Sequence, residues 1–88
     1  MPLISQFYGI LISMYKQDGG RHKVPHFHAY YGDFECVYGL HGELMAGELP
    51  IKQKKMVEAW AAIHEEELVA EWKSIMELGQ HFKIDGLK

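Results

Sequence analysis

Apolar and polar positions alternate along residues 10–15 with a period of two. This alternation is typical of a β-strand that buries one face, because successive side chains of a strand point to opposite sides. The face expected in the core consists of Ile10, Ile12 and Met14. The polar stretch 16–25 contains two consecutive glycines and ends at Pro25, so it predicts a loop.

Segment 26–38 predicts a β-hairpin. Gly32-Asp33 separates two runs rich in aromatic residues, and the glycine supplies the positive φ that a two-residue hairpin turn needs. A turn of this length sets the strand register. In that register one face is apolar or aromatic throughout, pairing Tyr31 with Phe34, Ala29 with Cys36 and Phe27 with Tyr38. We expect this face to pack on the core.

The other face of the hairpin is polar. It pairs Tyr30 with Glu35 and His28 with Val37, and it has His26 at its end. Both imidazole rings should lie on this face, because residues two apart on a strand point the same way. We call the set His26, His28, Tyr30 and Glu35 the polar hairpin face. It is the candidate functional site that the sequence predicts.

Three interpretations of the polar hairpin face remain open on the residues alone. In the first, the histidines are structural, packing on neighbouring rings and hydrogen-bonding a carboxylate or a carbonyl. In the second, His26, His28 and Glu35 hold a divalent metal as the protein's cofactor, and Asp18 or His22 approaches from the loop.

The third interpretation is catalysis or ligand recognition without a metal. Histidine titrates near neutral pH, so His26 and His28 can act as general acid and base, with Tyr30 or Arg21 beside them. Such a set would suit a ribonuclease-type hydrolase. Aromatic residues on a sheet also form platforms for single-stranded RNA, and Tyr30 shares the face with the histidines.

Helical periodicity replaces the alternation after Pro50. The two apolar stripes consist of Met56, Val57, Trp60 and Ile63, then of Leu68, Val69, Trp72, Ile75 and Met76. The second stripe is rotated by roughly a third of a turn, so one straight helix cannot bury both against one sheet. The sequence predicts two helices with a break near His64. Glu65–Glu67 would fill the first turn of the second helix, and Gly79 would cap its end.

His64 is expected to hydrogen-bond at the break, with a ligand-binding role as the alternative. Residues 43–49 are a further candidate strand, and the alternation of Phe82 and Ile84 indicates a short final strand. The pattern therefore predicts one α+β domain over residues 1–88. It has an antiparallel sheet of three to four strands from the N-terminal half, packed against two C-terminal helices.

Composition narrows the classes of function. Of the 88 residues, 48 % are hydrophobic, as in a globular chain, and neither half is strongly basic at a net charge of −3. Duplex binding is therefore not indicated, although Lys52, Lys54 and Lys55 form a small basic patch, either solvated or in contact with phosphate. The sequence has no phosphate-binding glycine loop and no serine-hydrolase elbow. The core of so short a chain is thin, and association into a homo-oligomer would bury more apolar surface, so a second copy is one candidate partner.

The single cysteine and the apolar N-terminal residues indicate the cellular compartment. Cys36 is the only cysteine, which excludes an internal disulfide and a thiolate zinc cluster and fits a reducing cytosol. The apolar run before Lys16 has no positive charge and is interrupted by polar residues. It therefore predicts neither a signal peptide nor a membrane span. We expect a cytoplasmic protein with no membrane partner.

Several motifs match a known family. They are Met1-Pro2, Phe7-Tyr8-Gly9-Ile10, Asp18, Pro25-His26-Phe27-His28-Ala29, Leu49-Pro50, Trp60, His64, Glu67-Leu68 and Trp72. On these residues the chain resembles small bacterial proteins that share domain of unknown function 4160. The resemblance brings no established activity. Members are often encoded next to another short uncharacterised protein, as toxin–antitoxin pairs are, so the resemblance implies a protein partner.

The favoured hypothesis is a protein-interaction module of an operon-encoded, toxin–antitoxin-like complex, with nucleic acid as a further candidate ligand. It rests on the small size, the incomplete catalytic set and the implied gene context. The alternatives are a metal-independent ribonuclease-type hydrolase that uses His26 and His28, and a metal-binding domain on the same face. Whether the protein is an enzyme is left open.

Overall fold

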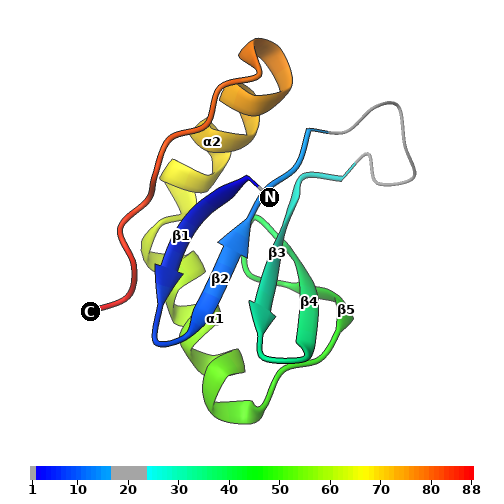
Figure 1. Cartoon of the computed structure of the whole chain (residues 1–88). Coiled ribbons are helices and arrows are strands. Elements are labelled where there is room, and N and C mark those ends of the chain that lie inside the picture. The colour runs from blue at the N-terminus through cyan, green and yellow to red at the C-terminus, as the bar shows by residue number, and fades with distance from the viewer. Residues whose placement is uncertain (1, 17–23) are drawn as a thin grey trace.

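The computed structural model describes residues 2–16 and 24–88, with a sheet first and helices second (Figure 1). The strands are β1 (Leu3–Phe7), β2 (Ile10–Ser13), β3 (His26–Tyr31), β4 (Phe34–Gly39) and β5 (Leu44–Gly47). The helices are α1 (Ile51–Ile63) and α2 (Glu65–Leu78). The sheet is antiparallel with strand order β1-β2-β3-β4-β5. The predicted α+β class is confirmed.

The strand count was predicted wrongly, since the sheet has five strands rather than three to four. β1 is the additional strand. A register shift between Leu3 and Ser5 breaks its alternation, so the period of two is absent from the sequence. The turn between β1 and β2 is also unusual, because Tyr8 stands at positive φ (48°) where Asn or Gly is the ordinary signal.

The short final strand is a second correction. No regular secondary structure follows Gly79. The backbone N–H of Ile84 donates to the carbonyl of Ile4 at 2.7 Å, but Phe82 is 39 % exposed and the segment forms no continuous ladder with β1. Figure 1 shows the C-terminal segment running back beside β1, so it lies along that outer edge of the sheet.

The predicted hairpin register is confirmed in full. All five predicted partner pairs, from Phe27 opposite Tyr38 to Tyr31 opposite Phe34, are observed, and His26 lies opposite Gly39. The apolar face is buried at Phe27, Ala29, Cys36 and Tyr38. Its two residues beside the turn are less covered, since Tyr31 is partly buried and Phe34 is 40 % exposed.

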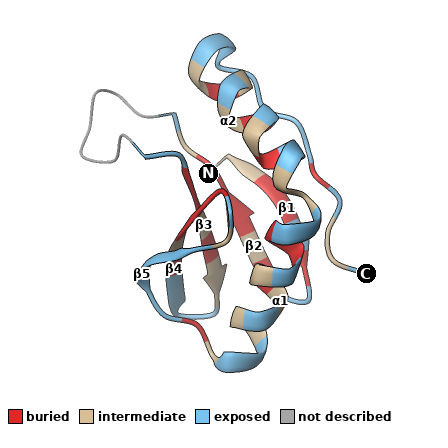
Figure 2. Ribbon diagram, turned by 180° about the vertical axis from the view of Figure 1, so that it is seen from behind, coloured by how far each residue is buried: buried red, intermediate tan, exposed pale blue. Residues whose placement is uncertain are grey.

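Both helices lie on one face of the sheet, and the buried residues gather between the two layers (Figure 2). The helical core side chains are Val57, Trp60, Ala61, Leu68 and Ile75. The predicted break is confirmed at His64, where φ is −109° and ψ is 26°. Gly79 caps α2 at a φ of 66°, also as predicted. Neither described helix is both long and apolar enough to cross a membrane.

One carboxylate is buried on the inner face of α2. Glu71 is fully buried, and its Oε2 accepts a hydrogen bond from the backbone N–H of Phe82 at 3.1 Å. Its Oε1 has no hydrogen-bond partner in the described part of the chain. Burial raises the pKa of the Glu71 carboxyl, and the Phe82 N–H, His81 and Lys83 oppose that shift.

We expect Glu71→Gln to stabilise the fold at neutral pH by about 1 kcal/mol. The amide still offers an acceptor to the Phe82 N–H, while a buried charge is removed. Because the folded pKa is raised, Glu71 favours folding below its unfolded pKa and loses that contribution as the pH rises through the folded value. Urea denaturation across the acidic range should show the two proteins converging in stability as the pH falls.

Glu77→Gln on the same helix is the matched control, since Glu77 is exposed and should change stability little. A Glu71→Gln protein that is less stable than wild type at neutral pH would contradict the argument. That result would mean that the charge of Glu71 contributes favourably to the fold.

Candidate functional site

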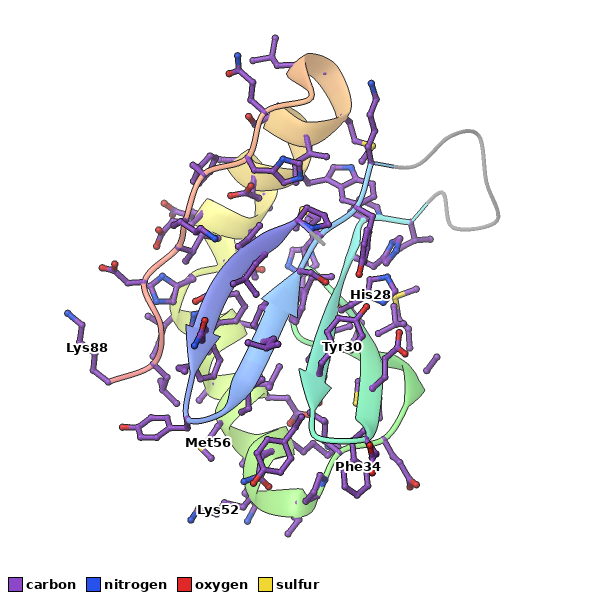
Figure 3. The ribbon with its side chains drawn as sticks, viewed as in Figure 1. His28, Tyr30, Phe34, Lys52, Met56 and Lys88 are labelled. Atoms are coloured by element: carbon purple, nitrogen blue, oxygen red, sulfur yellow. The ribbon has the colours of Figure 1, made fainter. Side chains whose placement is uncertain are left out.

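His28 and Tyr30 of the polar hairpin face lie on the side of the sheet away from the helices, whereas His26, at the start of β3, reaches Trp72 of α2. On β3, Phe27 and Ala29 point into the core, so His28 and Tyr30 point outward between them. Figure 3 shows these two side chains on β3, with the helices behind the sheet. The described members of the predicted site are therefore brought together by the strand geometry.

His28 stands at the centre of this face. Its ring lies edge-on to Tyr15 at a centroid distance of 5.0 Å and stacks with Tyr30 at 6.2 Å. Its Nδ1 is 3.4 Å from Oε2 of Glu35, a long contact. The His28 side chain is 19 % exposed, so a ligand can reach part of its ring.

Tyr30 is hydrogen-bonded to Tyr15, a residue that the sequence analysis did not place in the site. The hydroxyls of Tyr15 and Tyr30 are hydrogen-bonded at 2.8 Å. Burial raises the pKa of Tyr30 to about 12, and the bond to Tyr15 adds to this shift, while Ser13 opposes it. The phenol therefore stays protonated near neutral pH, where it can donate a hydrogen bond but cannot serve as a base.

His26 is more deeply placed than its neighbour. It is 1 % exposed, its Nδ1–H donates to the carbonyl of Val24 at 2.9 Å, and its ring lies 5.3 Å from that of His28. The indole of Trp72 from α2 lies 5.6 Å away. Catalysis by a histidine pair stays a prediction, but only His28 presents an accessible ring in this arrangement.

The metal interpretation also stays a prediction. Residues 2–16 and 24–88 hold no group of three or more His, Cys, Asp or Glu side chains placed to bind one ion. His26 directs Nδ1 to a backbone carbonyl, and His28 directs Nδ1 to Glu35. Asp18, Arg21 and His22, which were expected to approach this face, lie outside the described residues.

His64 is not part of this face. It lies between the two helices, with Nδ1 2.5 Å from Oε1 of Glu67 and its ring 5.6 Å from that of Trp60. This arrangement agrees with the expected hydrogen-bonding role at the break. His64 therefore lies apart from the polar hairpin face, and the alternative ligand-binding role stays a prediction.

A second histidine–carboxylate pair was not predicted. His41, in the turn after β4, is hydrogen-bonded through Nδ1 to Glu65 at the start of α2. The hydrogen bond to Glu65 and its negative charge raise the pKa of His41. The partners are far apart in sequence, so no local pattern signals their contact.

β5 gives the molecule a second notable surface. It is an edge strand that pairs only with β4, and all four of its residues are exposed. Leu44 is 42 % and Met45 is 41 % exposed, and no charged residue lies within the strand. Glu43 precedes β5 and Glu48 follows it, both exposed. The sequence predicted a strand here but gave no reason to expect so open an edge.

Comparison with known proteins returns one family. A family model described as Domain of unknown function (DUF4160) matches residues 9–73, about three-quarters of the chain. No curated protein and no solved structure matches the chain at a significant level.

Proposed function

Because the chain belongs to the family Domain of unknown function (DUF4160), whose description carries no activity, we propose a function from its geometry. The protein is an interaction module that binds an extended, basic segment of a partner protein along β5. In the toxin–antitoxin-like complex implied by the family resemblance, the protein encoded beside it is the first candidate partner. The observation that carries the proposal is the open apolar edge at β5.

The backbone of β5 is suited to strand addition. An edge strand presents N–H and C=O groups that a further strand can pair with. Every backbone hydrogen bond that supports β5 and its flanks comes from the β4 side, including Gly39 N–H to Glu43 O and Glu48 N–H to Glu35 O. No described strand pairs with the outer edge of β5, and the exposed Leu44 and Met45 offer apolar contacts.

The negative charges around β5 favour a basic partner segment. Glu43 and Glu48 stand at the two ends of β5, and Glu35 lies across the ladder with its side chain 55 % exposed. An incoming strand with Lys or Arg at each end would neutralise these carboxylates. A second copy of β5 would instead bring its own Glu43 and Glu48 against them, and like charges on opposed strands are destabilising.

The shape of the edge restricts pairing further. β5 has only four residues, and the register shifts between Val37 and Tyr38 where Leu44 is paired. Short, bulged edges resist indiscriminate association. Binding at β5 therefore depends on a segment with matching length and charge rather than on exposed backbone alone.

We expect a peptide with alternating Thr and Val and a Lys at each end to bind the protein and shift the amide resonances of β5 in an NMR titration. A twin peptide with Glu at each end should bind at least about tenfold more weakly, because it meets the carboxylates of Glu43 and Glu48. A Glu43→Gln, Glu48→Gln double variant should lose most of this preference.

The matched control is a Glu66→Gln, Glu77→Gln double variant, which removes the same charge from exposed positions on α2. It should keep the preference for the basic peptide. Equal binding of the two peptides, or shifts confined to strands other than β5, would refute the proposal. Concentration-dependent dimerisation through β5 would also refute it, because the occupant would then be a second copy.

A further inference from the structure

A cavity of about 550 Å³ opens at the end of the molecule where β1 turns into β2. It lies between that turn, the start of α1 and the end of the chain, and its lining includes Tyr8, Tyr31, Lys52, Met56 and Lys88. Figure 3 shows Lys52 and Met56 projecting from the first turns of α1. The volume is within the range of small-molecule sites in proteins.

Tyr8 occupies its position at a conformational cost. Its φ is 48°, in the left-handed region, which is unfavourable for a residue other than glycine. The side chain is 61 % exposed, so burial in the core does not offset that cost. The neighbouring turn residue, Gly9, lies under the ring of Tyr31, which a Cβ on Gly9 would approach to 3.4 Å. Two phenol rings thus stand at the cavity.

The charges around this cavity favour an anion. Lys52 is exposed and forms no ion pair with a described residue, whereas Lys54 is bound to Glu58 at 2.8 Å. No acidic side chain lines the cavity. The first turn of α1 also contains no acid, although acids are common there.

We propose that this cavity binds one nucleotide unit, with the base against Tyr8 and Tyr31 and the phosphate at Lys52. Tyrosine rings stack on any base, and a lysine ammonium is an ordinary phosphate partner. A free mononucleotide and the end of a single strand carry the same chemistry. The net charge of −3 confines attraction for a polyanion to such a local site.

This site is separate from the one in the proposed function. β5 and β1 are the opposite edges of the sheet, and the cavity lies beside β1 and the turn that follows it. A peptide on β5 and a nucleotide in the cavity can therefore be bound together. Failure of either binding test leaves the other unaffected.

Isothermal titration calorimetry with AMP and with a short single-stranded RNA tests the proposal, and inorganic phosphate is the third probe. We expect AMP or the RNA to bind, and Lys52→Glu to weaken that binding at least about tenfold. Lys73→Glu makes the same charge change at an exposed position on α2 and should leave affinity within about twofold. Tighter binding of AMP or of the RNA identifies the source of the nucleotide unit.

Tyr8→Asn separates binding from folding. Asparagine tolerates the left-handed conformation, so this variant should melt at a higher temperature than wild type. It should nevertheless bind the nucleotide about fivefold or more weakly, because a stacking ring is lost. The proposal fails if neither AMP nor RNA binds, if Tyr8→Asn and Lys52→Glu bind like wild type, or if inorganic phosphate binds as tightly as AMP.

Discussion

Trp60→Ala should remove a large part of the protein's stability. The indole is fully buried and packs against two aromatic rings of the sheet. The ring centroids lie 5.4 Å apart for Phe7 of β1 and 5.7 Å apart for Phe27 of β3. Its Nε1–H donates to the carbonyl of Asp85 at 2.8 Å. Truncating a buried tryptophan costs about 3–5 kcal/mol. That loss is a large part of the roughly 5–10 kcal/mol that stabilises a domain of this size.

Urea denaturation followed by far-ultraviolet circular dichroism measures this loss. Trp60→Phe is the informative companion, because it retains an aromatic ring between the layers and gives up only the Asp85 hydrogen bond and part of the volume. It should lose roughly half as much stability as Trp60→Ala. Trp72→Ala should also cost less than Trp60→Ala, since Trp72 is only partly buried. A Trp60→Ala protein as stable as wild type would show that the core lies elsewhere.

Gly47→Ala should detach β5 from the sheet. Gly47 has a φ of 79°, and a Cβ placed there would lie 2.1 Å from the carbonyl oxygen of Glu35 and 3.0 Å from Cα of Cys36. Both are backbone atoms of β4 and cannot rotate away as a side chain can. We expect a loss of roughly 2–4 kcal/mol, measured by urea denaturation, together with faster amide hydrogen exchange along β5.

Gly32→Ala is the matched control for this substitution. Gly32 also has a positive φ, 56°, but no atom outside its immediate neighbours lies within 4 Å of an added Cβ. Only the conformational cost of about 1 kcal/mol should remain. Equal losses from the two substitutions would mean that the close approach to Glu35 is not what requires glycine at position 47. The Gly47→Ala protein should also lose binding of the basic peptide, because its docking strand is displaced.

The features of the fold that depend on residues close in sequence were predicted correctly. The two-residue turn at Gly32-Asp33 was enough to place every pair of the β3–β4 hairpin, and the rotation of the apolar stripe was enough to place the helix break at His64. β1 was missed because its bulge removes the alternation. The final strand was predicted from the alternation of Phe82 and Ile84. That prediction was wrong, because this segment makes one backbone hydrogen bond to β1, from Ile84 to Ile4, rather than a ladder.

In the candidate site, contacts within one hairpin were predicted, whereas contacts between segments far apart in sequence were missed. His28, Tyr30 and Glu35 were grouped correctly because one hairpin carries all three. Tyr15 was missed because the register of β2 against β3 is set across a long connection, where Ser13 pairs with His28. Trp72 was expected in the core, but its contact with His26 depends on how α2 crosses the sheet, which no short pattern encodes.

The segment that follows α2 has a consequence for the size of any assembly. Ile84 N–H donates to Ile4 O, and Lys83 Nζ donates to Leu3 O at 2.8 Å, so the chain's own end occupies the outer side of β1. A filament of sheets needs two free, complementary edges on every subunit. If β5 accepts a foreign strand as proposed, the occupied outer side of β1 leaves no second free sheet edge in the described part of the chain through which the assembly could extend. The resulting complexes should be finite, with one partner segment for each chain.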